Sequence, residues 1–301
     1  YYDVNLKKAR LRNLQTHPNF KFYRGLVQDG VYLEKIFSKH KPKIIVHLAA
    51  QAGVRYSIDN PFSYVESNLF GTFQILEMAK KHNPQHLLIA STSSVYGGNK
   101  KIPFDEKQNT DMPISFYAAT KKSNEIMAHS YSHLFSIPTT MFRFFTVYGP
   151  WGRPDMALFK FTKSILAGEP IEVFNFGEHR RDFTYIDDIV DGLLRVIENI
   201  PDSNSDWDGI TPDPATSLAP WRIYNIGNND PVNLMDFIET LGEALGRKVE
   251  FNLLPLQPGD VPDTYADVSD LAAQLNYKPS TKIKDEIKNF VEWYFHHFIK
   301  K

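Results

Sequence analysis

Short, continuously apolar segments alternate with amphipathic segments along the first half of the chain. Residues 43–50 (KIIVHLAA) and 86–92 (HLLIAST) are typical of strands in a parallel sheet that helices cover on both faces. Residues 31–40, 63–82 and 116–135 have the periodicity of amphipathic helices. Because such alternation is typical of βαβ units, the sequence predicts a doubly wound α/β fold.

The same pattern predicts where the chain divides. In residues 1–149 we also expect a helix at 4–14 and strands at 20–28 and 138–149. After Gly149-Pro150 the alternation loosens, so residues 150–301 are predicted to form a smaller, mixed α/β portion. Within that portion, three segments are distinctive: 182–199 and 222–228, which we expect to return to the main sheet, and 201–220, a long polar loop.

Composition excludes several classes of function. The formal charge is -1, from 34 basic and 35 acidic residues, so no global field would attract nucleic acid or an anionic membrane. The chain has no cysteine, which excludes disulfides, thiolate zinc sites and a thiol nucleophile. No run approaches 18 uninterrupted apolar residues. We therefore expect a cytoplasmic protein with no metal, nucleic-acid or membrane partner.

Tyr117 and Lys121 lie four residues apart and therefore share one face of the predicted helix 116–135. A nearby cation favours the phenolate form of tyrosine, which can then act as a general base. The pair follows the strand that ends in Ser91-Thr92-Ser93-Ser94, and ligands of open α/β sheets bind at such strand ends. The pattern indicates proton transfer at an alcohol, and the alternative is a surface tyrosine and lysine on an amphipathic helix.

The chain resembles the extended short-chain dehydrogenase/reductases, and within them the NAD-dependent nucleotide-sugar epimerases and dehydratases. The resemblance covers essentially the whole chain, and the order of its motifs makes it specific. Those motifs are HLAAQAGVRYS (47–57), NLFGT (68–72), STSSVYG (91–97), YAATK (117–121), RFFTVYGPWGRPDMA (143–157), RRDFTYIDDIVDG (180–192), YNIGN (224–228) and PGDVPDTYAD (258–267).

This resemblance implies a Rossmann-like fold and assigns three catalytic residues. Tyr117 is the base that takes a proton from a sugar hydroxyl, Lys121 binds the nicotinamide ribose and lowers the tyrosine pKa, and Thr92 is their hydroxyl partner. Contacts with NAD are implied for Tyr117 and Lys121 themselves and for Ala49, Ala50, Gln51, Asn68, Ser91 and Phe144. Helix–sheet packing is the alternative for the two alanines, and a solvated helix position is the alternative for Asn68.

The sequence departs from the family pattern at its beginning. The family opens with a strand, a glycine-rich turn and a helix, whose N-terminus holds the cofactor pyrophosphate. No such segment is present in this sequence, which resembles the family from just after the second strand. We expect either part of a complete enzyme, which we favour, or a truncated, inactive homologue with an exposed strand edge.

Ser93 and Ser94 separate the possible sugar chemistries. The family's 4,6-dehydratases carry Asp-Glu at these positions as acid and base, and its decarboxylases usually carry a Glu at the second. Without either carboxylate, the resemblance leaves 4-epimerisation through a transient 4-keto sugar. Ser93, Ser94 and Thr146 can also donate hydrogen bonds to a uronate carboxylate, which a carboxylate side chain would repel. Alternatively, the serines only satisfy backbone groups at the strand end.

The resemblance is closest to UDP-glucuronate 4-epimerases, and UDP-galactose or UDP-N-acetylglucosamine 4-epimerases are the alternative. It implies further contacts of a UDP-sugar with Arg153, Val173, Phe174, Arg181 and Asp260. Surface charge is the alternative for Arg153, and plain core is the alternative for Val173 and Phe174. Family members commonly dimerise through the helices at 63–82 and 116–135, so we also predict a homodimer.

Overall fold

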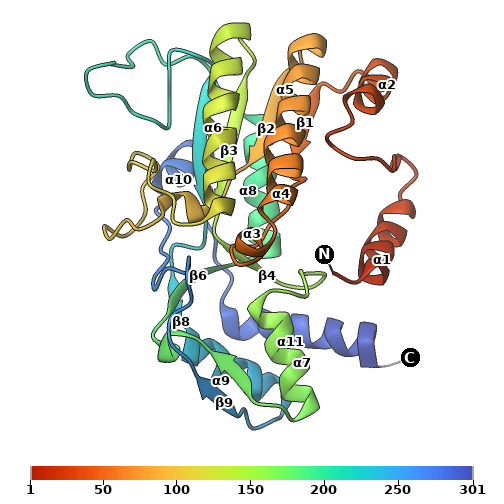
Figure 1. Ribbon diagram of the computed structural model, residues 1–301, viewed down its shortest axis with the longest axis vertical. Helices are drawn as coiled ribbons and strands as arrows, with labels where there is room; N and C mark the ends of the chain where they lie inside the picture. Colours follow the sequence, from red (N-terminus) through yellow and green to blue (C-terminus); the bar gives the residue numbers. More distant parts are fainter. Residues whose placement is uncertain (1, 300–301) are drawn as a thin grey trace.

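The computed structural model describes residues 2–299, and its centre is a four-stranded parallel sheet in the order β1-β2-β3-β7 (Figure 1). Registers such as Val46 with Leu88 and Leu88 with Thr140 are continuous along the strands. The predicted doubly wound, Rossmann-like sheet is therefore confirmed. Its strands are β1 (Ile44–His47), β2 (His86–Ala90), β3 (Thr139–Phe144) and β7 (Trp221–Ile226), the last of which comes from the second half of the chain.

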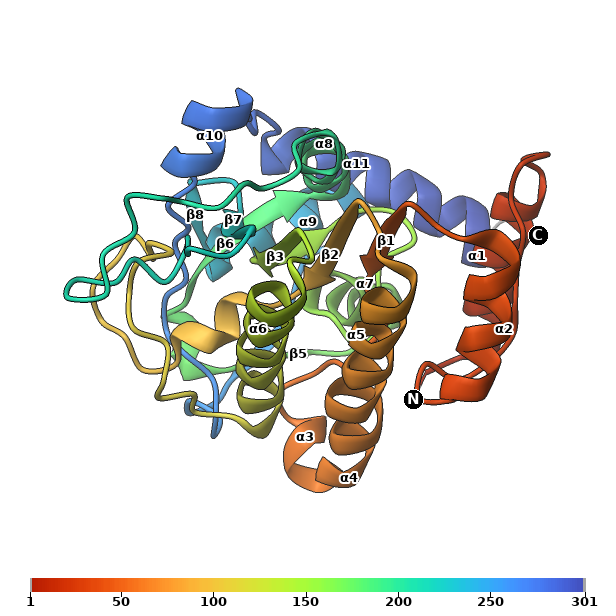
Figure 2. The ribbon, with the colours of Figure 1, turned by 90° about the horizontal axis from the view of Figure 1, so that it is seen from above.

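Helices cover both faces of this sheet, as Figure 2 shows from above. Leu87 and Ile89 of β2 are buried in one cluster with residues of α5 and α6, whereas Leu88 is buried in another cluster with residues of α8. Because successive strand side chains point to opposite faces, an apolar run on β2 serves both clusters. The covering helices are α2 (Gly30–His40), α5 (Gly71–His82) and α6 (Phe116–Phe135) on one face and α8 (Ile186–Glu198) on the other.

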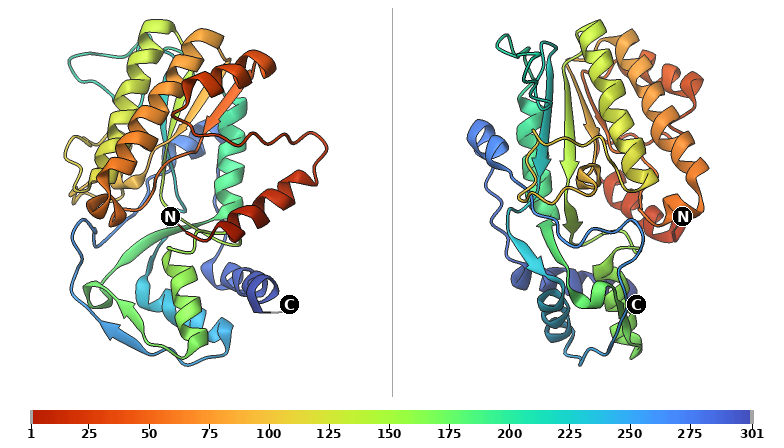
Figure 3. Two further views of the ribbon diagram at one scale, coloured as in Figure 1. Left: turned by 45° about the vertical axis from the view of Figure 1, so that its right-hand side comes forward. Right: turned by 60° about the vertical axis from the view of Figure 1, so that its left-hand side comes forward.

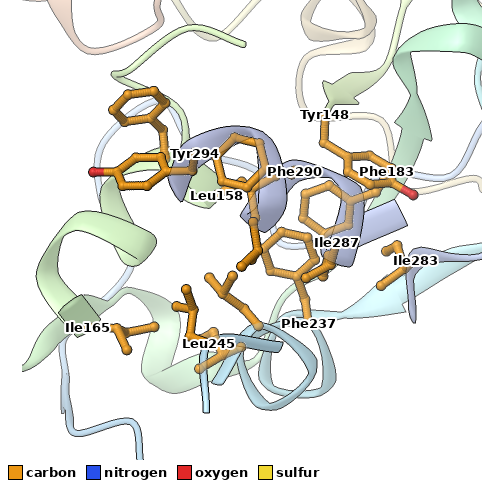
Figure 4. Close-up of a cluster of buried hydrophobic side chains, with 14 of the residues drawn as sticks. Tyr148, Leu158, Ile165, Phe183, Phe237, Leu245, Ile283, Ile287, Phe290 and Tyr294 are labelled. Atoms are coloured by element: carbon orange, nitrogen blue, oxygen red, sulfur yellow. The ribbon is translucent and has the colours of Figure 1, made fainter. Parts of the chain in front are cut away.

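A second portion lies beyond the C-terminal ends of these strands, in the lower half of Figure 1. Its aromatic and aliphatic side chains form one cluster, in which Phe183 and Phe237 stack with ring centroids 4.4 Å apart (Figure 4). Its elements are β4 (Thr146–Tyr148), β6 (Arg180–Tyr185) and β8 (Pro231–Asn233) in one sheet, β5 (Ile171–Val173) and β9 (Phe251–Leu253) in another, and helices α7 (Ala157–Ala167), α9 (Leu234–Leu245) and α11 (Ile283–Tyr294).

Several short elements connect or flank these two portions. Helix α1 (Val4–Gln15) reaches the second portion (Figure 3), where the Arg10 guanidinium donates to the Gly152 carbonyl at 2.8 Å. The others are α3 (Tyr56–Asp59), α4 (Pro61–Tyr64), α10 (Ser269–Leu275), π-helical turns at Val65–Phe70 and Phe295–Ile299, and 3-10 turns at Ser93–Tyr96 and Asn175–Gly177. None of the helices within residues 2–299 is long and apolar enough to cross a membrane.

Three expected elements differ from the structure. The predicted strand at 20–28 is wrong: this segment is irregular, with Phe22 and Leu26 exposed, and no strand within residues 2–299 pairs with it. The predicted strand at 138–149 is two strands, β3 and β4, which enter different sheets. The predicted helix at 63–82 is a rod made of α4, a π-helical turn and α5. These three differences cannot be predicted from sequence periodicity, because they depend on contacts with segments that are distant in the sequence.

Candidate active site

The predicted catalytic residues lie at the C-terminal edge of the main sheet. Thr92 follows β2, and Tyr117 and Lys121 lie in the first two turns of α6. The Ser115 hydroxyl caps this helix by accepting from the Ala118 N–H at 3.1 Å. The sheet edge faces the second portion of the molecule (Figure 1), so a ligand here could touch both portions.

The segment STSSVYG forms a tight turn at the end of β2. Thr92 is buried, and its Oγ1 accepts from the Ser94 N–H at 3.2 Å, which begins the 3-10 turn Ser93–Tyr96. Gly97 ends the turn at φ +56°, where a Cβ would lie 2.3 Å from the Met112 carbonyl oxygen. Ser93 and Ser94 are both half-buried. The turn therefore presents hydroxyl groups, and no carboxylate, beside Thr92.

Tyr117 is held on both sides. Its N–H donates to Ser57 Oγ at 3.1 Å, and its ring meets the ring of buried Tyr64 edge-on, with centroids 6.1 Å apart. Burial raises the pKa of Tyr117, while a hydrogen bond with Thr92 and the charge of Arg153 act to lower it. Two of the candidate site residues, Thr92 and Arg153, thus favour ionisation of the phenol, and the catalytic roles of Thr92 and Tyr117 stay predictions.

Lys121 is a buried lysine, with 4% of its surface exposed, so the alternative of a surface lysine is wrong. Its Nζ donates to the carbonyl oxygen of Ala90, the last residue of β2, at 2.8 Å. Burial lowers the pKa of Lys121 to about 8, and the negative charge of Glu125 opposes this shift. Lowering of the tyrosine pKa by Lys121 itself stays a prediction, since Thr92 and Arg153 are the groups that lower it here.

Asn68 fixes the end of β1. Its Oδ1 accepts from the Gln51 N–H at 2.8 Å, and its Nδ2 donates to the Gln51 carbonyl and to Thr120 Oγ1, both at 3.0 Å. The side chain is completely buried, so the alternative of a solvated position is wrong. By contrast, Ala49 and Ala50 are exposed rather than packed between helix and sheet. Contacts of these four residues with NAD stay predictions.

Phe144 and Ser91 complete the set of residues predicted to contact NAD. Phe144 is half-buried at the end of β3, with its ring stacked on Phe142 at 5.4 Å. Ser91 is buried, and its hydroxyl donates to Glu125 Oε1 at 2.6 Å. Both residues lie at strand ends beside Thr92, and their contacts with a cofactor stay predictions.

Thr146 and Arg153 line one small cavity, of about 40 Å³, where β3 passes into the second portion. The Arg153 guanidinium is partly exposed and makes a two-pronged ion pair with Asp155, with Nε 3.0 Å from Oδ1. Its charge also acts on Tyr117. The structure therefore brings these two predicted sugar contacts together, close to the proposed base.

The residues predicted to contact the nucleotide belong to the second portion and to the segment after β9. Phe174 is half-buried. Val173 is fully buried in the core cluster, and its carbonyl accepts from the Leu254 N–H at 2.8 Å, so the structure favours the alternative of plain core for Val173. Arg181 donates from Nη1 to the Pro262 carbonyl at 2.6 Å, and its guanidinium feels the charge of Asp260. Their contacts with a nucleotide stay predictions.

Sequence reasoning missed three residues that organise the site. Arg55 bridges the two portions: its Nη2 lies 3.0 Å from Asp260 Oδ2, and its guanidinium lies 4.6 Å from the centroid of the Phe174 ring. Ser57 holds the Tyr117 backbone, and Glu125 holds Ser91. Arg55 and Ser57 stand in the motif HLAAQAGVRYS, which was a usable signal, whereas Glu125 looks like any helix carboxylate.

A metal site is not indicated. Within residues 2–299, no three His, Asp or Glu side chains come together in a group able to hold an ion. The chemistry available at this edge is that of a phenol, an ammonium and several hydroxyls.

Comparison with known proteins places the chain. The model of the family described as "NAD dependent epimerase/dehydratase family" matches residues 3–210. The chain belongs to this NAD-dependent epimerase/dehydratase family. The family expected from sequence motifs is thus confirmed.

Within the epimerase/dehydratase family, the chain is similar to two curated bacterial proteins. Protein CapI of Staphylococcus aureus is 51% identical over 300 residues, which cover 100% of this chain and 90% of CapI. A probable UDP-glucuronate 4-epimerase of Rhizobium meliloti is 50% identical over 298 residues, which cover 98% of this chain and 86% of that protein.

The fold is also similar to a solved epimerase structure. The UDP-glucuronic acid 4-epimerase of Bacillus cereus, in complex with UDP-glucuronic acid and NAD, superimposes with a TM-score of 0.86 at 30% sequence identity. The match covers 98% of this chain and 88% of that one. The likeness therefore extends over both portions of the molecule.

Proposed function

We propose that the chain is an NAD-dependent UDP-sugar 4-epimerase that interconverts UDP-glucuronate and UDP-galacturonate. The similarity to UDP-glucuronate 4-epimerases from two bacteria supports the substrate class. The arrangement of the strand-end residues supports the chemistry. One observation carries the proposal. Thr92 contacts Tyr117 beside buried Lys121, and the turn that begins after Thr92 has hydroxyls at the positions where dehydratases need carboxylates.

The residues at the sheet edge fit the nicotinamide end of NAD. An ammonium has three N–H donors, and Lys121 gives one of them to Ala90, which leaves donors for ribose hydroxyls. Exposed Ala49 and Ala50 leave space beside the backbone after β1, and Asn68 holds that backbone in place. Lys121, Gln51 and Phe144 would hold this end of the cofactor. NAD, when bound, supplies the acceptor and donor of the hydride at C4.

Tyr117 does the proton chemistry. Its phenolate takes the proton of the C4 hydroxyl, while Thr92 hydrogen-bonds to the reacting oxygen and orients it. Thr92 and Arg153 lower the tyrosine pKa against the effect of burial, and so favour the base form. After the 4-keto sugar has turned, Tyr117 returns the proton to the same oxygen. The turn Ser93–Tyr96 holds no carboxylate of the kind that dehydratases use for C5 chemistry, so the proposed steps end at the epimer.

Recognition of the uronate rests on Ser93, Ser94 and Thr146. Hydroxyl donors stabilise a carboxylate through charge-assisted hydrogen bonds, whereas Asp or Glu here would repel it. Arg153, at the cavity that Thr146 lines, adds a positive charge. For the nucleotide, Arg181 would contact the diphosphate, Phe174 would flank the uracil, and Asp260 would lie at the ribose.

Incubation with a panel of nucleotide sugars tests this proposal. We expect the NAD-loaded protein to convert UDP-glucuronate to UDP-galacturonate, with UDP-glucose and UDP-N-acetylglucosamine turned over at least about 100-fold more slowly, because they lack the carboxylate. Turnover of UDP-glucose without UDP-glucuronate would overturn the assignment. A Ser94→Asp variant provides a further test. Its carboxylate should repel the uronate, so turnover of UDP-glucuronate should fall more than turnover of the uncharged UDP-sugars.

We also propose that two copies associate through α5 and α6. These helices lie side by side on one face of the sheet (Figure 2), where Tyr131 of α6 donates to Glu77 of α5. Large apolar side chains stay exposed on both: Phe73 is 38% exposed and Ile126 is 60% exposed. Exposed apolar surface of this kind is typical of an interface. The cytoplasmic location and the division near residue 149 stay predictions from sequence.

A further inference from the structure

Glu125 is a buried carboxylate that the proposed mechanism does not use. Only 2% of the residue is exposed, and it lies one turn after Lys121 on α6. Burial alone would raise its pKa, but the charge and hydrogen bonds of Arg143, together with the charge of Lys122 and the hydrogen bond from Ser91, hold the pKa below its usual value. An ionised carboxylate is therefore kept beside the site at considerable desolvation cost.

Helix α6 is attached to the end of β2 at two successive residues. Lys121 Nζ donates to the Ala90 carbonyl at 2.8 Å, and Glu125 Oε1 accepts from Ser91 Oγ at 2.6 Å. The next residue along the strand end is Thr92, which contacts Tyr117 one turn earlier on the same helix. The strand end and the helix are thus fixed against each other over three consecutive residues.

Arg143 holds Glu125 from behind. Its Nε and Nη2 each lie 3.0 Å from one of the two carboxylate oxygens, so the pair is bidentate. The guanidinium is completely buried, and its Nη1 donates to Tyr96 and to the Glu106 carbonyl, both at 3.2 Å. Such geometry locks the rotamer of Glu125 and the place of its charge.

We propose that Glu125 is a positioning residue of the reaction: anchored by Arg143, it fixes the strand end at Ser91 and keeps the neighbouring Lys121 ammonium charged and in place. This inference rests on the role proposed above for Lys121.

None of the other charged or titratable groups named around Lys121 stabilises its charged form as Glu125 does. His47 on β1 is buried, and burial together with the charge of Lys121 lowers its pKa to about 3, so it is neutral. Arg143 on β3 and Lys122 on α6 are cationic, and burial raises the pKa of Tyr117, which favours its neutral form in the free protein. Glu125 is the group whose charge opposes the loss of the Lys121 proton.

A measurement without turnover tests the coupling. Lys121 has its pKa lowered from 10.5 to about 8, so the folded protein gives up this proton before the unfolded chain does, and stability rises between those pH values. The difference in unfolding free energy between the protein and Lys121→Met isolates this rise. We then make the same comparison in proteins that carry Glu125→Gln, with and without Lys121→Met. There the rise in unfolding free energy should begin about one pH unit lower, because the attraction between Glu125 and the Lys121 ammonium is lost.

Turnover of the NAD-loaded enzyme gives the second readout. Glutamine can still accept from Ser91 and from Arg143 Nε through its one oxygen, so Glu125→Gln removes the charge and one of the two bonds to Arg143. We expect kcat to fall about tenfold at pH 8.5 and less than about twofold at pH 6.5, as a lysine with a lower pKa loses its proton. Tyr96→Phe is the matched control: it removes a hydroxyl that bonds to Arg143 and Asn225 without changing charge, so neither pH profile should move.

The outcomes separate the two levels of the account. Two results would overturn the role of Glu125. The first is that the stability difference due to Lys121 rises at the same pH with and without Glu125→Gln. The second is that the ratio of kcat between the natural protein and Glu125→Gln is constant with pH. Full activity of Lys121→Met would instead contradict the proposed role of the lysine, and the stability difference would still decide the coupling. If Glu125→Gln does not fold with Arg143 unpaired, Glu125→Gln with Arg143→Met serves, since Arg143 does not itself shift the Lys121 pKa.

Discussion

At the scale of single residues, the site consists of a phenol, an ammonium and hydroxyls, each held by named partners. Replacing Tyr117 by Phe removes the base and little else, because its backbone bond to Ser57 and its ring contact with Tyr64 persist. We expect epimerisation to fall by about 10²–10⁴-fold. Binding of UDP, measured by calorimetry, should be unchanged, and preserved turnover would contradict the assignment of the base.

A second prediction at this scale concerns Glu106, a buried carboxyl that accepts from the Asn225 N–H at 2.7 Å. Burial raises its pKa from 4.5 to about 7. Its folded form therefore keeps a proton that the unfolded chain has lost, and stability falls as pH rises from about 4.5 to about 7. Glu106→Gln should remove up to about 3 kcal/mol of this loss.

Unfolding of both proteins in urea at pH 4.5 and pH 8 measures this effect. The unfolding free energy of the variant should increase relative to that of the natural protein as pH rises from about 4.5 to about 7, and the difference should stay constant above pH 7. An equal difference at both pH values would show that Glu106 ionises normally in the fold.

Some of these residues could be predicted from the sequence, and others could not. The four-residue spacing of Tyr117 and Lys121 and the strand end at Thr92 are local patterns, so they could be recognised. Glu125 could not, because its partners Ser91 and Arg143 are 34 and 18 residues away in sequence and only the sheet brings them together. The burial of Lys121 and Asn68 follows from the same packing.

At the scale of elements, the helical rod from α4 to α5 supports the end of β1. The π-helical turn Val65–Phe70 carries Asn68, whose amide holds Gln51 and Thr120. A π-helical turn shifts the side-chain register along a helix, and such turns are frequent at functional sites. The expected helix at 63–82 was recognised from its periodicity, but this turn inside it was not.

Asn68→Ala tests that support. The change leaves the part-buried N–H and carbonyl of Gln51 without the side chain that they bond to, which should cost about 1–3 kcal/mol of unfolding free energy. Affinity for NAD, measured by fluorescence titration, should fall with it. Lys80→Ala, at an exposed position of α5, is the control and should change stability by less than about 0.5 kcal/mol. Equal stabilities of the two variants would contradict the supporting role.

The elements that sequence missed share one cause. Residues 20–28 have strand-like composition, yet a strand exists only where a neighbour completes its hydrogen bonds, and the described chain offers none there. The apolar run 138–149 continues through Phe145, but β3 pairs with β2 and β7 whereas β4 pairs with β6. Local composition predicts that a strand forms, and distant segments decide where it ends.

At the scale of the whole molecule, the face formed by α5 and α6 predicts a dimer. Phe73→Glu together with Ile126→Glu places charges on the exposed apolar surface of both helices. Analytical ultracentrifugation should find two copies for the natural sequence and one for the variant, because a buried unpaired charge costs several kcal/mol. The matched control Lys163→Glu, at an exposed position of α7 in the second portion, should leave association unchanged. A monomer before mutation would contradict this prediction.

The two portions of the molecule meet at the edge where Thr92, Tyr117 and Lys121 lie, and the proposed reaction oxidises and then restores C4 of one sugar at this edge. UDP-glucuronate carrying deuterium at C4 tests that claim most directly. The NAD-loaded enzyme should produce UDP-galacturonate that keeps the deuterium at C4, and Tyr117→Phe should produce it about 10²–10⁴-fold more slowly. Product in which solvent hydrogen replaces the deuterium at C4, or no product from this substrate, would contradict the account.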